Sequence, residues 1–466
     1  MSRSGRWSGA GVRVFVCLLV FLALTLERED FASGYWNTVM VYTRPLFRGS
    51  PVNVWDVAVG LAALALALRP ATWRNQVRPL NLALLASLLA LLGMAAWGVL
   101  RGGDPRMAYF QLGALLRMFL LVPILFGAFR TSRDLRLLAG TVLAAAVYRA
   151  VACILCFNLV IRTGGTPRWP DYVTDHHDST LWVAALVGLL SWALVRRRIR
   201  TALGVGLLSL LLLLAVYYNN RRMAWLELLG GLLLAYLVIP RGSHRRWLNR
   251  WATVVAPVVL VYVVVGWGQS GKVFTPVQRV RSAMTDDRND SNLYRNIENA
   301  GLIVTLQGSP LLGTGFGRPF VEVSTVYTSG MRSYFGDYLY LPHNSVLGLA
   351  ASTGLVGFPV IWAFLSVGAF LAARARAFAR RPRDQVVSTV AFAFPFIYGQ
   401  QAFGDMGLQS MTANIILACA LAAAGRIAVL TGAWPTRRLR SLRLTVPAHR
   451  QLEQTLPART QALEPS

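Results

Sequence analysis

NLYR (292–295), PLLGTGFG (310–317) and LPHNS (341–345) follow one another along the chain and run into the apolar segment GLAASTGLVGF (348–358). These polar motifs bring His343, one of only five histidines, to the start of an apolar helix. Histidine titrates near neutral pH, which suits a general base. The stretch therefore predicts a chemically active loop at the mouth of a membrane helix.

The composition places the rest of the chain in a membrane. Of its 466 residues, 55% are hydrophobic and only 14% are charged, whereas a soluble domain has about 25% charged residues. The net charge is +27. Basic connections between spans explain most of this excess, and no zinc-finger spacing or aromatic-basic pattern indicates nucleic-acid binding.

Apolar segments of membrane-spanning length predict an all-α polytopic protein with about twelve transmembrane helices. The predicted spans lie at about 14–26, 53–68, 79–100, 109–129, 137–161, 179–195, 202–218, 223–239, 251–267, 343–372, 387–403 and 411–430. We therefore divide the chain into nine spans (1–267), a large and partly helical loop (268–342), three further spans (343–430) and a tail of disordered composition (431–466).

Arginine-rich connections set the predicted orientation. They lie at 69–78, 130–136, 196–200, 241–250 and 374–383, and all five alternate onto the side of the N-terminus. The positive-inside rule makes that side cytoplasmic, so the loop 268–342 is expected to face outward. The prediction is a multi-pass membrane protein whose loop 268–342 faces the periplasm or the cell exterior.

Several arginines do not fit this charge rule. Arg221 and Arg222 lie on the predicted outer side, and Arg117 and Arg149 lie within spans. Snorkelling or pairing with a membrane acid such as Glu227 is one interpretation. The other is an anion site, because a guanidinium group stays charged and its planar fork matches phosphate oxygens.

The loop 268–342 offers more candidates. Its arginines include Arg288 and Arg295, and the latter begins an amphipathic run (294–307). PLLGTGFG lacks the Lys and Ser/Thr of a phosphate-binding P-loop, so we predict a tight turn that returns the chain to the membrane.

Two acidic motifs could suggest a metal. Asp286, Asp287 and Asp290 have a DDxxD spacing, but the sequence offers no second acidic motif to complete a magnesium site. In DHHD (175–178), adjacent residues rarely form a metal set. There we expect Asp178 to cap a helix, while a substrate contact by His177 stays open. No metal and no cofactor are predicted.

This combination resembles the O-antigen ligase and polymerase superfamily of bacterial envelope glycosyltransferases. Members share about twelve spans, a large outer loop late in the chain, a PHNS-like motif that opens the next helix, and a small-residue Arg motif matched here by RMAW (222–225). The recognisable motifs cover about residues 215–360, and the remainder matches in topology alone. Arg221 departs from the pattern, since ligases often have serine or another small residue there.

The resemblance implies metal-independent transfer of a glycan from undecaprenyl pyrophosphate to a lipid A-core hydroxyl, or to another glycan acceptor. By motif match it assigns roles to His343, Arg222 and Arg295. His343 would be the general base, and Arg222 and Arg295, with Arg221, Arg117 and Arg149, would bind the donor pyrophosphate. Asn344, Arg288 and His177 are candidate substrate contacts.

Three alternatives remain. A polymerase of the same superfamily would use a second lipid-linked glycan as its acceptor. A transporter would also explain twelve spans and arginines within them, although the sequence has no internal repeat of the kind common in transporters. A non-catalytic scaffold would not need arginines inside the spans.

Overall fold

The computed structural model describes residues 4–26, 46–47, 52–67, 77–163, 173–269, 271–285, 290–324 and 338–434. Within these residues, nine helices are long and apolar enough to cross a membrane, and two shorter apolar helices cover 10–25 and 54–66. With α8, Arg222–Val238, the structure has a helix at each of the twelve predicted spans. The predicted class, an all-α polytopic membrane protein, is confirmed.

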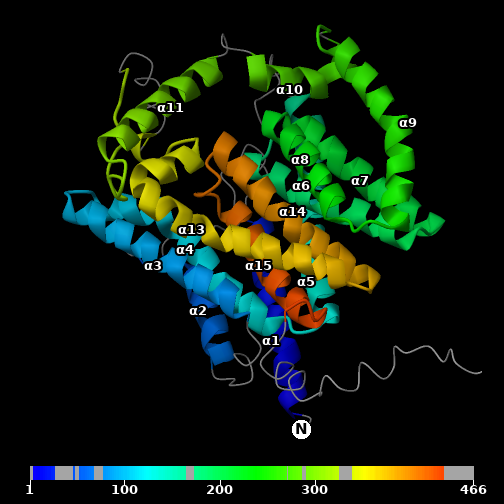
Figure 1. Ribbon diagram of the computed structural model, residues 1–466, viewed down its shortest axis with the longest axis horizontal. Helices are drawn as coiled ribbons and strands as arrows, with labels where there is room; N and C mark the ends of the chain where they lie inside the picture. The colour runs from blue at the N-terminus through cyan, green and yellow to red at the C-terminus, as the bar shows by residue number, and fades with distance from the viewer. Residues whose placement is uncertain are drawn as a thin grey trace, which may run out of the picture.

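The helices follow one another without a strand in the described part of the chain (Figure 1). Their bounds are α1 Ser4–Thr25, α2 Val54–Ala67, α3 Arg78–Leu100, α4 Pro105–Ala128, α5 Ser132–Cys156 with a π-helical turn at Phe157–Ile161, α6 His176–Arg196, α7 Ile199–Asn219, α8 Arg222–Val238, α9 Ser243–Gly266, α10 Thr275–Thr285, α11 Asp290–Gly308, α13 Ser345–Phe378, α14 Pro382–Gly404 and α15 Met411–Leu430. Single 3-10 turns lie at Lys272–Phe274 and Tyr338–Tyr340.

Several helices begin before the predicted apolar spans, because their capping residues lie in the polar connections. The Thr131 and Asp134 side chains form a reciprocal capping box at the start of α5. Asp104 caps α4 just before Pro105, and Ser410 caps α15. Each cap satisfies amide groups that would otherwise lack a partner at a helix end.

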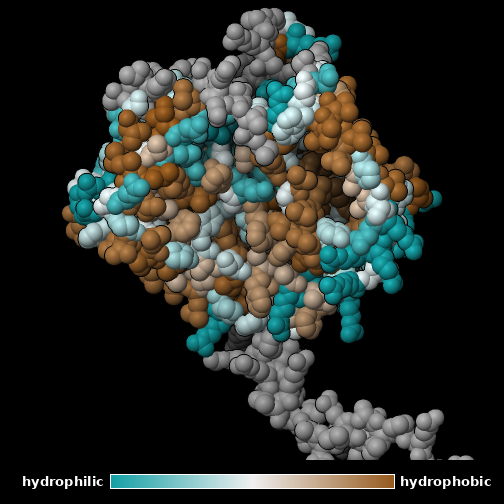
Figure 2. All heavy atoms as spheres, turned by 45° about the horizontal axis from the view of Figure 1, so that its top comes forward, coloured by the Kyte–Doolittle hydropathy of each residue, from teal (hydrophilic) through white to brown (hydrophobic). Residues whose placement is uncertain are grey.

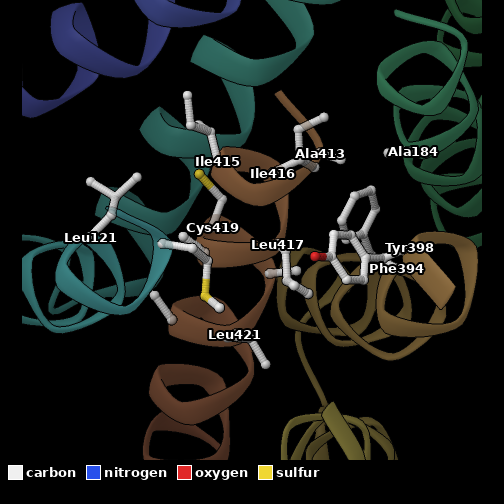
Figure 3. Close-up of a cluster of buried hydrophobic side chains, with 14 of the residues drawn as sticks. Leu121, Ala184, Phe394, Tyr398, Ala413, Ile415, Ile416, Leu417, Cys419 and Leu421 are labelled. Carbon is white, nitrogen blue, oxygen red and sulfur yellow. The ribbon is translucent and has the colours of Figure 1, made fainter. Parts of the chain in front are cut away.

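The most buried helix is α15, which packs against α4, α13 and α14. Figure 3 shows Leu417 and Leu421 of α15 among side chains that include Leu121 of α4 and Phe394 and Tyr398 of α14. The outer helices present apolar side chains to the surroundings, as the brown flanks in Figure 2 show. The exposed valines of α9 are an extreme case. This pattern is what a bundle immersed in lipid requires.

Basic connections that are far apart in sequence meet at one end of the bundle. Arg136, at the start of α5, lies close enough to Arg196 and Arg383 for their charges to interact. His244, at the start of α9, is similarly influenced by Arg197 and Arg376. The connections near 130–136, 196–200, 241–250 and 374–383 therefore share an end, as the alternation of the spans requires.

Helix α13 is interrupted at Gly354, whose φ of +61° is not helical. The segment 309–317 fills the break with backbone hydrogen bonds. The amides of residues 314 and 315 donate to the carbonyls of 351 and 352 at 3.1 and 2.9 Å, and the amides of 355 and 356 donate to the carbonyls of 310 and 311 at 2.8 and 3.1 Å. Two carbonyls before the break and two amides after it are thus paired with the segment.

The same segment also docks on α3 and α4. The Phe316 amide donates to the Met94 carbonyl at 3.2 Å, and the Gln111 side chain accepts from the Gly317 amide at 2.7 Å. PLLGTGFG does return the chain to the bundle. However, it is not one tight turn as predicted. It is a longer glycine-rich segment with positive φ at 313, 315 and 317.

Replacing Gly315 with alanine should destabilise the protein. Its φ is +82°, and an added Cβ would lie 2.2 Å from the Gly98 Cα of α3, so we expect the free energy of unfolding to fall by about 2 kcal/mol or more. Thermal unfolding of the purified protein in detergent measures the change. Gly93→Ala is the matched control on α3, because nothing lies within 4 Å of its added Cβ. Equal midpoints for the two variants would contradict close docking of the segment on α3.

Candidate functional site

The candidate site lies at the bundle end opposite the basic connections, where α8, α11 and α13 begin or pass and α14 ends. Two carboxylates tie these elements together. Glu298 of α11 holds the residues before α13, and Asp405, which follows α14, holds arginines from α8 and α11.

His343 is oriented by Glu298. The His343 Nδ1 lies 2.9 Å from the Glu298 Oε2, while the Glu298 Oε1 accepts from the backbone amides of His343 at 2.6 Å and of Asn344 at 3.3 Å. An ionised carboxylate only accepts hydrogen bonds, so it favours the tautomer with the proton on Nδ1. The Nε2 lone pair of His343 is then available to accept a proton, and the side chain is 18% exposed.

The Glu298 carboxylate is only 1% exposed and therefore acts strongly on its neighbours. The Tyr338 ring centroid lies 6.5 Å from that of His343. Burial, followed by the negative charge of Glu298, raises the pKa of Tyr338. The tyrosine therefore stays neutral beside the His343–Glu298 pair.

Asn344 fixes the start of α13. Its Oδ1 accepts from the Leu347 amide at 3.0 Å, which caps the helix, and its Nδ2 donates to the Asn299 Oδ1 at 3.2 Å. The Ser345 hydroxyl lies 3.3 Å from the Asp405 carbonyl. These contacts set His343 beside α11 and beside the end of α14.

Asp405 brings two of the predicted arginines together. Its Oδ2 lies 2.5 Å from the Arg221 Nη2 and 3.9 Å from the Arg295 Nη2. Its Oδ1 accepts from the Met406 amide at 2.9 Å. The carboxylate is nearly buried, whereas the Arg295 side chain is 31% exposed, so Arg295 presents its charge at the surface of the site.

Arg222 is held against α10 and α11. Its Nη1 donates to the Ser282 carbonyl at 3.2 Å and to the Asn292 Oδ1 at 3.0 Å. Asn292, Arg295 and Glu298 recur every three residues along α11 and therefore share a face of that helix. One face of α11 thus contacts Arg222, contributes Arg295 and orients His343.

The start of α8 is chemically unusual. Arg221 and Arg222 occupy the N-cap and first positions, no side chain caps the helix and no acid lies in its first turn. The helix dipole places partial positive charge at this end, which disfavours arginines and favours an anion. Together with Arg295, this end of α8 forms a concentration of positive charge that suits phosphate oxygens.

The structure does not bring Arg117 and Arg149 into this cluster. The Arg117 Nε pairs with the Asp56 Oδ1 of α2 at 2.8 Å. Arg149 is buried, and its Nη2 pairs with the Asp178 Oδ2 at 2.6 Å. These acids take the place of Glu227, which the sequence suggested as a partner. A role for either arginine at the pyrophosphate stays a prediction.

The remaining predicted residues lie away from the arginine cluster or among residues that the structure does not describe. His177 is buried on α6, with its Nδ1 2.9 Å from the Asp175 Oδ1. Asp178 was wrongly expected to cap α6, since Asp175 supplies the cap and Asp178 pairs with Arg149. Arg288 and the acidic pair 286–287 lie outside the described residues, as does the side chain of Asp290.

Sequence reasoning missed Glu298 and Asp405. The spacing of Glu298 from Arg295, three residues on an amphipathic helix, could have revealed it. Asp405 follows an apolar span directly, where an acid at membrane depth calls for a partner. In the described part of the chain, no three His, Cys, Asp or Glu side chains gather as a metal site would require.

These features define a multi-pass membrane protein with a histidine–carboxylate pair beside a cluster of arginines. Residues 207–362 match the family model described as O-antigen ligase. The match confirms the resemblance to the O-antigen ligase superfamily, and it indicates a glycosyltransferase-like enzyme. The matched segment contains Arg221, Arg222, Arg295, Glu298 and His343, whereas Asp405 lies beyond it. No curated protein sequence matches this chain.

Proposed function

We propose that this protein is an O-antigen ligase, which transfers a glycan from undecaprenyl pyrophosphate to a hydroxyl of a lipid A-core acceptor. The observation that carries the proposal is the meeting of three arginines with the His343–Glu298 pair at the start of α8. The arginines suit a donor whose leaving group is a pyrophosphate, and the His343–Glu298 pair suits an acceptor hydroxyl that must lose its proton.

In the proposed step, the acceptor oxygen attacks the anomeric carbon of the donor sugar. His343 Nε2 takes the hydroxyl proton as the new carbon–oxygen bond forms. The bond between the anomeric carbon and the pyrophosphate oxygen breaks, and its electron pair leaves with the pyrophosphate. Arg221, Arg222 and Arg295 stabilise the negative charge that develops there. The proton ends on His343, whose positive charge Glu298 then stabilises.

Asp405 is a positioning residue in this proposal. It keeps the Arg221 and Arg295 guanidinium groups near one another, although their positive charges repel. One negative charge against two positive ones leaves a net attraction for a pyrophosphate, so the arginines are oriented before the donor arrives.

The test is glycan transfer by the purified protein with a lipid-linked donor and alternative acceptors. A ligase transfers to lipid A-core, whereas a polymerase of the same superfamily extends a second lipid-linked glycan. Movement of substrate across a vesicle membrane without transfer would indicate a transporter. We expect EDTA to leave the transfer rate unchanged. Loss of activity in EDTA that magnesium restores would instead point to Asp286, Asp287 and Asp290.

His343→Ala should lower turnover by roughly 10² to 10⁴-fold, the usual contribution of one general base, and should leave donor affinity nearly unchanged. Glu298→Gln should also lower turnover, because an amide no longer fixes the proton on Nδ1. The double variant should be no slower than His343→Ala, since both changes remove one function. Asn296→Ala, on the exposed side of α11, is the control. Additive losses in the double variant would separate Glu298 from the role of His343.

Arg222→Ala and Arg295→Ala should each raise the KM for the donor by about 10 to 100-fold, since each removes charged hydrogen bonds to the pyrophosphate. Lysine should restore only part of the loss, because it lacks the planar fork. Steady-state kinetics over a range of donor concentrations measures both effects. Arg318→Ala is the control, because Arg318 contacts the Arg101 carbonyl rather than the cluster. Unchanged donor KM in both alanine variants would refute the assignment.

The site should face the periplasm, because the arginine-rich connections meet at the opposite end of the bundle. Single cysteines at Gln307 and Ala377, both exposed positions, test this in intact cells with a thiol reagent that does not cross the inner membrane. The native cysteines at 17, 153, 156 and 419 are buried and should stay unlabelled. We expect labelling at 307 alone; labelling at 377 alone would reverse the orientation.

A further inference from the structure

An apolar groove of about 710 Å³ runs beside the candidate site, between α8, α13 and α14. Figure 1 shows α14 between the other two helices, so α14 forms the floor and α8 and α13 the walls. Apart from Ser366 and Gln400, its lining is apolar. A volume in this range suits a sizeable ligand.

One end of the groove adjoins the arginine cluster. Met223 and Phe403 line that end; Met223 follows Arg222 in the chain, and Phe403 lies two residues before Asp405. The α8 wall and the α14 floor also meet there, since a Cβ added at Gly404 would lie 2.5 Å from the Met223 Sδ. This end of the groove therefore lies next to Arg222, which precedes Met223 in the chain, and near Asp405, which pairs with Arg221.

From Met223 the groove extends along α8 as far as Leu233. Ten residues of helix correspond to about 15 Å, roughly half of the hydrocarbon thickness of a bilayer. The groove thus leads from the predicted headgroup level into the middle of the membrane.

We infer that this groove binds the first isoprene units of the donor's polyprenyl chain while the arginines bind its pyrophosphate. The inference rests on the proposed function, because it takes the donor to be a polyprenyl pyrophosphate. In such a donor the hydrocarbon joins the pyrophosphate with no spacer, which matches a groove that begins beside the arginines. In lipid A-core, by contrast, core sugars separate the acceptor hydroxyl from the acyl chains.

Gly399 offers a clean way to fill the groove. It lies on the floor, and nothing lies within 4 Å of an added Cβ, so the first atom of a larger side chain has open space there. Gly230 on the facing wall is less suitable, because an added Cβ would lie 2.6 Å from the Gln400 side chain. Gly140 on α5 also has open space around it, far from the groove in sequence, and Gly140→Leu is the matched control.

The experiment compares two glycan donors, one with the polyprenyl chain and one with a single isoprene unit on the pyrophosphate. Gly399→Leu should raise the KM for the polyprenyl donor about tenfold by excluding several buried carbon atoms, and should leave the KM for the short donor unchanged. Ser366→Leu, on the α13 wall, should act in the same direction. Equal KM values for the polyprenyl donor in Gly399→Leu and Gly140→Leu would overturn the inference.

A photoactivatable polyprenyl phosphate gives a readout independent of turnover. It should cross-link to α8 or α14 in the wild-type protein and much less in Gly399→Leu. Equal cross-linking by a photoactivatable phospholipid would show an adventitious lipid and overturn the inference. If the wild-type protein transfers glycan from neither donor but the polyprenyl probe still labels the groove, the proposed function fails while the groove assignment stands.

Discussion

A charged side chain inside a membrane bundle is costly unless it has a partner, and this constraint organises the protein. Arg149 with Asp178, both buried, and Arg117 with Asp56, both partly exposed, join helices of the bundle. At the site the same requirement has a different outcome. Glu298 contacts the His343 side chain, which can gain or lose a proton, and neighbouring backbone amides. Asp405 is shared by more than one arginine.

The two kinds of pair therefore have different consequences. In a buried pair such as Arg149–Asp178, the two opposite charges compensate each other, and the pair holds two helices together. Asp405 carries one negative charge and is shared by two arginines, so a net positive charge remains. This charge lies next to the start of α8, which itself favours anions. Arg149 and Arg117 therefore join helices, whereas the arginines around Asp405 keep an excess of positive charge.

Apolar length and the distribution of arginines were sufficient to predict the helices and their order, because lipid imposes one secondary structure and a strong compositional pattern on every span. The ends were less predictable. Caps such as Asp104 and Thr131 lie in polar connections, so α4 and α5 begin several residues before their apolar segments. Asp175 rather than Asp178 caps α6, because Asp178 forms an ion pair with Arg149, which is distant in sequence.

The site was predictable in its positive charges and its histidine but not in its acids. Which acid pairs with which arginine depends on contacts across long stretches of chain, such as that between Arg221 and Asp405, and no local pattern encodes them. Arg117 and Arg149 show the converse case. Each has an aspartate partner, yet their position within spans fits structural pairing and ligand binding equally well.

The interrupted helix α13 has a consequence for how the chain can vary. The carbonyls of residues 310–311 and the amides of residues 314–315 pair with four backbone groups of α13 on either side of Gly354. Their register is fixed at both ends, by α13 on one side and by α3 and α4 on the other. Adding or deleting one residue within 309–317 would misalign these donors and acceptors. We therefore expect changes of chain length to be tolerated less within 309–317 than in the connections outside it.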